Sequence, residues 1–379
     1  MHTSEYANFL KAFFPVFNKI LQHGSAKFED CPEQKLRNVL LEILNRLPHN
    51  ETLRQYVADL LTLSMHILNT DNEENSLICL RIIFDLHKNY RPTLDAYAQP
   101  FLNFVRTLYT NFQGMVTANF GAGFAMGDPA APQPDAAAAA AAQPVAAQPP
   151  AEGFGGLEGD KPKAGVLVRS TDSFKVLIEC PLIVMFLFQL YPKYIQENIQ
   201  VLLPLMVASI DPLPGAAASA TPTPARATPA MQDYIAAQVK TVYFLSYLLR
   251  QFSEIMRPHQ EAIPKAVVNL LRTCPGDAIA IRKELLVATR HILATDFRNG
   301  FFAQKDILLD ENVLVGEGRT GTHARSWSEQ PSATLTPLPC VHAALQTLRP
   351  FAYHFLAELV HHVRLDLKIP QVRSRQPRR

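Results

Sequence analysis

Apolar residues recur along the chain at intervals of three and four positions. Between residues 36 and 47 they occupy positions 36, 39, 40, 43, 44 and 47, and Pro48 follows directly. This spacing places all six side chains on one face of an α-helix, which the proline ends. The same spacing recurs in residues 53–68 and at positions 9, 10, 13, 14, 17, 20 and 21. The pattern predicts amphipathic helices whose apolar stripes face a core.

Short polar turns, rather than alternating strands, separate these helices. The turn NTDNEENS at 69–76 is rich in helix-capping residues, and residues 76–90 are apolar on almost every side, as in a helix buried on several faces. Leu36 and Leu77 hold similar places in successive helical pairs, 41 residues apart. HEAT and armadillo repeats recur at about 40–47 residues. We therefore predict an all-α fold, a HEAT/armadillo-like α-solenoid of antiparallel helix pairs.

Helical and non-helical segments alternate along the rest of the chain. Helical repeats are predicted at 1–120, 166–210 and 231–315, with a terminal helix at 346–369. The interruptions are an Ala/Pro/Gly-rich insertion at 121–165, a Pro/Thr/Ala-rich loop at 211–230, an irregular insertion at 316–345 and a basic tail at 370–379. The first insertion has too little apolar surface to offset the entropy of ordering, so we predict that it is disordered. The others are predicted to be loops and a solvated chain end.

The charge balance argues against a protein that coats nucleic acid. Lys and Arg number 36 against 34 Asp and Glu, whereas such a protein needs a strongly basic face to replace counterions. The most apolar window, 181–191, is shorter than the roughly 20 residues of a bilayer span. The five cysteines are scattered and have neither disulfide-framework nor zinc-site spacing. We expect no direct nucleic-acid contact and no membrane insertion.

The stretch RKELLVATRHILATDFRNGF, residues 282–301, carries two acids, four strong bases and a histidine, enough to suggest an active site. On a helix, Arg282 and the other bases lie mostly away from the apolar side. Glu284 has no second carboxylate for acid–base catalysis, and His291 has no adjacent Ser or Cys nucleophile. We interpret the stretch as a solvated or interfacial helix face.

The segment AYHFLAELVHHV at 352–363 is the second candidate for chemistry. His354, Glu358 and either His361 or His362 share a helix face that could present two imidazoles and a carboxylate to a metal ion. The spacing is not H-E-x-x-H, no further ligand is evident, and vicinal histidines near a helix C-terminus also suit the helix dipole. We predict no catalytic, cofactor-binding or metal site. A metal-dependent enzyme using His354, Glu358 and His362 is the alternative.

Four long strings, in the same order, resemble one protein family. They are TDNEENSLICLRIIFDLHKNYRP, YIAAQVKTVYFLSYLLR, IRKELLVATRHILATDFRNGF and TLRPFAYHFLAELVHHVR. They are similar to the HEAT-repeat region of the transformation/transcription domain-associated protein (TRRAP) family, pseudokinase members of the PI3K-related kinase family. The likeness covers most of 1–120, 166–315 and 346–367.

The resemblance implies a noncatalytic nuclear scaffold of SAGA-type histone acetyltransferase complexes, acting in transcription regulation and chromatin-linked DNA repair. Its implied partners are transcription activators and other complex subunits, with no cofactor and no small-molecule substrate. The family's kinase-like domain has no counterpart here, so no catalytic residue is carried over. Because a solenoid needs polar caps at its ends and none is evident, we expect a fragment of a larger protein. A HEAT-repeat adaptor of another pathway is the alternative with the same fold.

Overall fold

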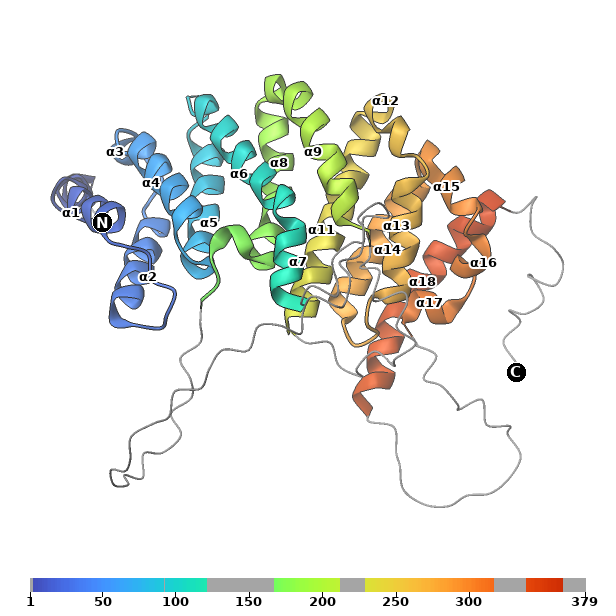
Figure 1. Cartoon of the computed structure of the whole chain (residues 1–379). Helices are drawn as coiled ribbons and strands as arrows, with labels where there is room; N and C mark the ends of the chain where they lie inside the picture. The colour runs from blue at the N-terminus through green and yellow to red at the C-terminus, as the bar shows by residue number, and fades with distance from the viewer. Residues whose placement is uncertain (1–2, 92, 121–166, 212–228, 317–338, 364–379) are drawn as a thin grey trace, which may run out of the picture.

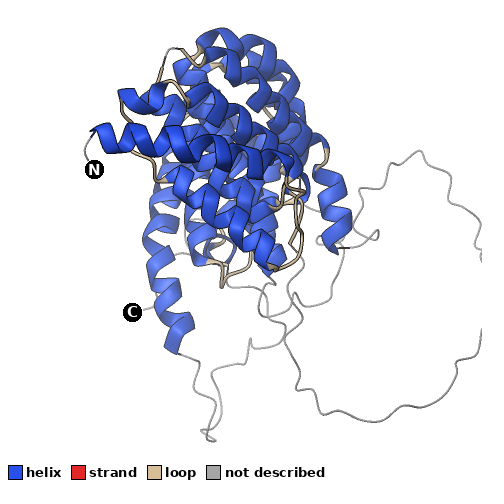
Figure 2. Ribbon diagram, turned by 90° about the vertical axis from the view of Figure 1, so that its left-hand side faces the viewer, coloured by secondary structure: helices blue, strands red, loops and turns tan. Residues whose placement is uncertain are grey.

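A computed structural model describes residues 3–91, 93–120, 167–211, 229–316 and 339–363. These residues form α-helices and 3₁₀ turns that stand side by side in an arched array (Figure 1). Figure 2 shows helices joined by loops, and the one β-type contact in the described residues is an isolated bridge between Asn72 and Arg169. The predicted all-α solenoid is confirmed.

The array is built of antiparallel helix pairs, each with a first and a second helix. The first pair is α1 (Thr3–His23) with α2 (Pro32–Asn45), and the second is α3 and α4 (Glu51–Arg54, Val57–Thr70) with α5 (Glu73–Asn89). The third pair is α6 and α7 (Ala98–Thr110, Phe112–Phe120) with α8 (Phe174–Leu190), and the fourth is α9 (Ile195–Ser209) with α11 (Pro229–Gln251). The fifth pair is α12 and α13 (Ser253–Met256, Ala262–Thr273) with α14 (Ile279–Leu293), and the sixth is α15 to α17 (Asn299–Phe302, Lys305–Leu308, Glu311–Val315) with α18 (Pro339–Val363). The second helices α2, α5, α8, α11, α14 and α18 contact one another in series and form one layer. The first helices α1, α4, α6 and α9 pack in series in the other layer.

Polar turn residues begin the helices, as the sequence pattern indicates. The Asn50 side chain accepts hydrogen bonds from the backbone N–H groups that open α3, and Asn72 does the same for α5. Pro32 opens α2, where its missing N–H costs nothing. Within α5, Ile78, Leu80 and their apolar neighbours on several sides are buried. These caps hold the turns short enough for successive helices to pack against each other.

Several helix boundaries differ from the prediction. The helix expected over 53–68 is divided into α3 and α4. Within the repeats predicted at 231–315, α11 ends before Phe252, whose backbone leaves the helical region at φ −136° and ψ 46°. Periodicity reports an apolar face but not where the chain turns toward the next pair. Helix α11 begins at Pro229, inside the predicted loop, and α18 begins at Pro339, inside the predicted insertion. Proline is compatible with a first helical turn, so a Pro-rich composition does not exclude a helix start.

Other predicted segments lie outside the described residues. These are the insertion at 121–165, the tail at 370–379, residues 364–369 of the terminal helix, and most of the segments 211–230 and 316–345. Within the described ranges, no single helix is long and apolar enough to cross a bilayer. Phe174–Leu190 and Pro192–Ser209 meet that criterion only as a pair, by length and composition, and are bent by 116° at their junction.

His87 is a buried titratable group between the second and third helix pairs. Its Nδ1 atom lies 3.1 Å from the hydroxyl of Tyr191, which follows α8, and its side chain is excluded from solvent. Desolvation lowers the pKa of His87 to about 4. The imidazole is therefore neutral in the folded protein at pH 7.

The free energy of unfolding is expected to fall by up to about 3 kcal/mol as the pH decreases from 6.5 to 4. The unfolded imidazole binds a proton near pH 6.5, whereas folded His87 does not until about pH 4. The stability contributed by the neutral imidazole is therefore complete above pH 6.5 and is lost as the pH falls from 6.5 to about 4. Urea unfolding at pH 7 and 4.5 measures the effect, and His87→Gln should flatten the pH dependence. If the free energy of unfolding fell by the same amount between pH 7 and 4.5 in the variant and the wild type, His87 would not be the group responsible.

Candidate functional site

The outward surface of the first helix pair carries large exposed apolar side chains. They are Phe13, Val16 and Ile20 on α1, exposed by 48, 50 and 38%, and Leu36, Val39 and Ile43 on α2, exposed by 51, 54 and 37%. We call these six residues the outer apolar face. They are half of the twelve large hydrophobic residues that are exposed in the described part of the chain. On each helix the three residues are three and four positions apart and so form one stripe, and exposed apolar stripes are typical of protein interaction sites.

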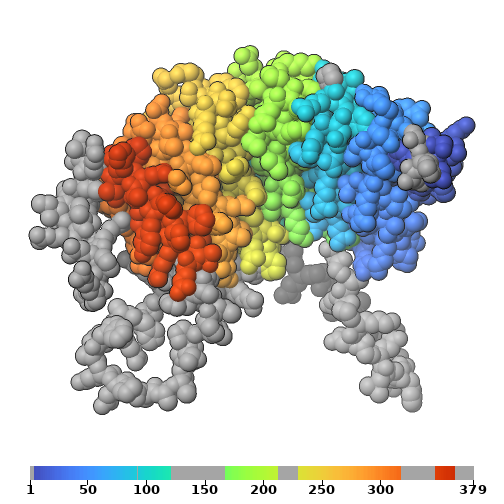
Figure 3. Space-filling model, turned by 180° about the vertical axis from the view of Figure 1, so that it is seen from behind, coloured from blue at the N-terminus to red at the C-terminus, as the bar shows by residue number. Residues whose placement is uncertain are grey.

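The outer apolar face corrects the sequence prediction, which placed five of its six residues toward the core. Leu10 and Phe14 of α1 and Leu40 and Leu44 of α2 are buried as predicted. In the described structure, however, the main packing neighbours of this pair are α3, α4 and α5, and the pair stands at one end of the array (Figure 3). The apolar stripes are wider than one neighbouring pair can cover, so part of each stripe faces outward.

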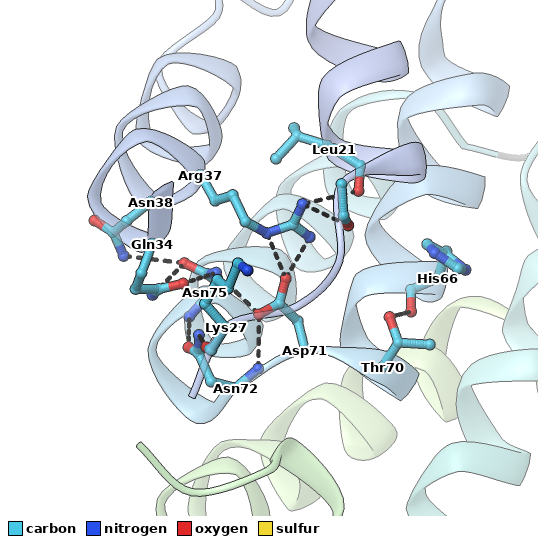
Figure 4. A network of polar contacts seen from close by, with 11 residues as sticks. Leu21, Lys27, Gln34, Arg37, Asn38, His66, Thr70, Asp71, Asn72 and Asn75 are labelled. Atoms are coloured by element: carbon cyan, nitrogen blue, oxygen red, sulfur yellow. Dashed lines mark hydrogen bonds and ion pairs between the residues drawn. The ribbon is translucent and has the colours of Figure 1, made fainter. Parts of the chain in front are cut away.

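A buried ion pair joins α2 to the turn between α4 and α5 (Figure 4). Arg37 donates to Oδ2 of Asp71 from Nε at 3.0 Å and from Nη2 at 2.5 Å, and both side chains are almost fully buried. Its Nη1 also donates to the carbonyls of Leu21 and Gly24, just where α1 ends. One guanidinium thereby joins α2 to the end of α1 and to the turn between α4 and α5.

Amide side chains complete this network at the second carboxylate oxygen of Asp71 (Figure 4). Oδ1 of Asp71 accepts from the backbone N–H of Asn72 at 2.8 Å and from the Asn75 amide at 3.1 Å. Asn75 and Gln34 exchange two further hydrogen bonds, of 3.2 and 3.0 Å. Since both carboxylate oxygens have donors, the charge of Asp71 is satisfied without solvent.

The described links between first and second helices lie along one edge of the array, which we call the corner edge (Figure 1). The segments 121–166, 212–228 and 317–338 each fall between a first helix and the second helix of the same pair. Polar side chains hold other corners as well, half-buried in the case of Asn111 and buried in the case of Gln238. Asn111 donates to Asp172 at 2.7 Å, and Gln238 donates to the Ser209 carbonyl at 2.9 Å.

Arg282, predicted to lie on a solvated face, is instead 1% exposed. It donates to the backbone carbonyls of Leu271 and Cys274 at the end of α13, and to those of Val313 and Leu314 in α17. Burial lowers the pKa of this guanidinium. Helix C-terminal carbonyls carry partial negative charge and so stabilise a cation that has no carboxylate partner. Helical periodicity could not reveal this, because the acceptors come from other helices.

The rest of the 282–301 stretch matches the interpretation as a solvated or interfacial helix face. Glu284 forms an exposed ion pair with Lys240 at 2.8 Å, and the His291 ring lies 6.0 Å from that of Tyr243. Partial burial, followed by the nearby Arg250 and Arg290, lowers the pKa of His291. The charged residues of α14 therefore bind neighbouring helices of the array.

The residues of the alternative metal site do not converge on a common point. Glu358 accepts a hydrogen bond from Arg290 Nε at 2.5 Å, while His354 and His361 are exposed. Partial burial, and then Arg298 and His361, lower the pKa of His362. Throughout the described ranges, no group of three or more His, Cys, Asp or Glu residues could hold a metal ion. The carboxylate of Glu358 instead joins α18 to α14.

Four cysteines, Cys31, Cys79, Cys180 and Cys274, are free thiols. Three of them, Cys79, Cys180 and Cys274, are buried, and burial raises the pKa of each. A protonated, desolvated thiol is a poor nucleophile and a poor metal ligand. These residues contribute to packing.

Known proteins align with almost the entire chain. Residues 230–375 match the family model described as "Tra1 HEAT repeat central region". "Probable transcription-associated protein 1" of Dictyostelium discoideum is 36% identical, and the match includes 98% of this chain and 8% of that protein. "Transformation/transcription domain-associated protein" of Homo sapiens is 34% identical, with 96% of this chain and 9% of that protein matched.

A yeast relative carries a more specific description. "SAGA complex/NuA4 acetyltransferase complex subunit TRA1" of Saccharomyces cerevisiae is 28% identical over 97% of this chain and 10% of its own length. The chain thus spans a tenth or less of the length of these relatives.

Proposed function

Since the chain is homologous, over nearly its whole length, to one stretch of the Tra1/TRRAP proteins, we propose that it is a noncatalytic scaffold segment of a SAGA- or NuA4-type coactivator. The observation that carries this proposal is the agreement between that full-length homology and an array of stacked helix pairs. Stacked pairs form a long surface of fixed shape, which suits the holding of other proteins.

The contacts described above support a scaffold with a rigid frame. The ion pair of Arg37 with Asp71 and the carbonyl contacts of Arg282 hold the corners of separate pairs. With the corners held, positions on different helices keep constant distances from one another. Covering the outer apolar face with another protein would lower the free energy, because it removes apolar surface from water.

The proposed partners are subunits of the acetyltransferase complex and transcription activators, and the proposed location is the nucleus. These follow from relatives named for SAGA and NuA4 acetyltransferase complexes and for transcription. The outer apolar face is proposed to contribute to contacts with complex subunits.

Capture of acetyltransferase-complex subunits from nuclear extract tests this function. The tagged chain should retain such subunits in cross-linking and mass spectrometry, whereas Leu36→Ser/Val39→Ser/Ile43→Ser should retain at least tenfold less. Each substitution lies at an exposed position and should change stability by only about 0.5 kcal/mol. Leu182→Ser, at a 53% exposed residue of α8, is the matched control. Absence of every acetyltransferase subunit from the wild-type sample would refute the function, and equal capture by the triple variant would refute the role of the face.

A further inference from the structure

Residues 167–173, which we call the strap, lead into α8 but first contact earlier helix pairs. The N–H of Leu167 donates to the carbonyl of Phe28, in the link between α1 and α2, at 2.7 Å. The carbonyl of Val168 accepts from the N–H of Glu73, at the start of α5, at 2.8 Å. The strap therefore touches the corners of both the first and the second pair (Figure 1).

Three further contacts hold the middle of the strap at these corners. The N–H of Ser170 donates to the carbonyl of Asp71 at 3.1 Å, and Arg169 forms the isolated β-bridge with Asn72. The Arg169 guanidinium lies 5.6 Å from the centre of the Phe28 ring. Backbone groups supply most of these contacts, as when an extended segment pairs with a strand edge.

Side chains fasten the end of the strap. The buried Glu73 carboxylate accepts hydrogen bonds from the Ser173 hydroxyl and from Lys175 Nζ, each at 2.7 Å. Ser173 is also the N-cap of α8, so the same residue begins that helix and contacts α5. The interaction with Glu73 raises the pKa of Lys175.

The strap is fastened to the third pair by Asn111, which follows α6. Its amide donates to the carbonyl of Thr171 at 3.2 Å and to the Asp172 carboxylate at 2.7 Å. The strap thus connects three successive pairs along the corner edge. In most helical-repeat arrays each repeat contacts only its nearest neighbours, so a contact between the first and third pairs departs from that rule.

From these contacts we propose that the strap is a latch that makes the first three helix pairs one cooperative unit. In a nearest-neighbour array, the first pair opens independently of the contacts within the third. With the strap in place, α1 and α2 lose part of their support whenever the strap detaches. Positions on the first and third pairs therefore keep a fixed distance, and detachment allows the first pair to move or to unfold locally.

Asn111→Ala gives the sharpest test, because Asn111 contacts the strap and none of its hydrogen bonds within the described residues reaches the first or second pair. Backbone amide hydrogen exchange of the full chain is measured at pH 7 by mass spectrometry. The latch predicts at least fivefold faster exchange both in the strap and in α1 and α2. Faster exchange confined to the strap and the third pair would overturn the proposal, as would no change in either region.

Glu73→Ala and Glu74→Ala form a matched pair that tests the attachment of the strap to the second helix pair. Both substitutions remove one carboxylate from the first turn of α5, but of the two it is Glu73 that accepts the hydrogen bonds from Ser173 and Lys175. Glu73→Ala should accelerate exchange in the strap and in α1 and α2 at least tenfold, while Glu74→Ala should remain within twofold of the wild type. Should Glu73→Ala not fold, Lys175→Met should give the same pattern with a smaller change. Similar hydrogen-exchange rates for the two glutamate variants would show that the contacts of Glu73 with Ser173 and Lys175 do not hold the strap in place.

Discussion

The variant Arg37→Met is expected to lose about 3–5 kcal/mol of unfolding free energy, because it leaves the fully buried carboxylate of Asp71 without its cation. It also removes the donor to the carbonyls of Leu21 and Gly24 at the end of α1. Urea unfolding followed by circular dichroism measures the loss, and hydrogen exchange should place it in α1, α2 and the start of α5.

Two further variants separate the ion pair from a general effect of removing a cation. Lys35→Met removes an exposed cation from the same helix, paired at 3.1 Å with Asp30, and should cost less than about 1 kcal/mol. Arg37→Met/Asp71→Asn removes both buried charges but keeps an oxygen that accepts from Asn72 and Asn75, and it should recover at least half of the loss, because the uncompensated carboxylate is then absent. A double variant less stable than Arg37→Met would show that the unpaired charge is not the cause.

Arg282→Met is expected to lower the free energy of unfolding by about 3–5 kcal/mol. The destabilised region should be the fifth and sixth helix pairs. Four backbone carbonyls of Leu271, Cys274, Val313 and Leu314 lose their donor, and each buried acceptor left unpaired costs about 1–3 kcal/mol before relaxation. Thermal and urea unfolding measure the loss.

A second substitution approaches the same guanidinium from outside. Gly316 has a φ of +79°, and a Cβ added there would lie 2.6 Å from the Arg282 guanidinium. Gly316→Ala should therefore destabilise the same corner, through backbone strain and through displacement of Arg282.

The neighbouring cation provides the control for Arg282. Lys283 is exposed and lies 4.7 Å from the centre of the Phe351 ring, so Lys283→Met should cost no more than about 1 kcal/mol. If Arg282→Met were no less stable than Lys283→Met, Arg282 would be a solvated residue, as the sequence pattern had indicated, and its contacts with α13 and α17 would carry no stability.

The class of fold and the rhythm of its pairs could be derived from local pattern. Apolar residues at helical spacing, capping residues such as Asn50 and Asn72, and the 41-residue separation of Leu36 and Leu77 all depend on short stretches of chain. Leu36 and Leu77 do lie in α2 and α5, successive second helices that contact one another. The buried side of α14, with Leu285, Ala288 and Ile292, was also evident from spacing.

The charged residues that matter most were not evident in the same way. From their positions in the sequence, Arg37 and Arg282 look like surface cations, yet both are buried. Their burial is possible because other helices and turns supply the hydrogen-bond acceptors. Glu73 and Glu74 are adjacent and chemically identical, but Glu73 is the one that accepts hydrogen bonds from Ser173 and Lys175, about a hundred residues further along the chain.

The sequence by itself determined that this chain forms stacked amphipathic helices, because helix formation and capping depend on residues within a few positions of one another. Only the tertiary structure decided which half of the stripe on α2 is exposed and which arginines are buried. It also decided that the third pair reaches back to the first. These outcomes depend on groups tens to more than a hundred residues away, and the desolvation of a charge is set by whichever atoms surround it in space.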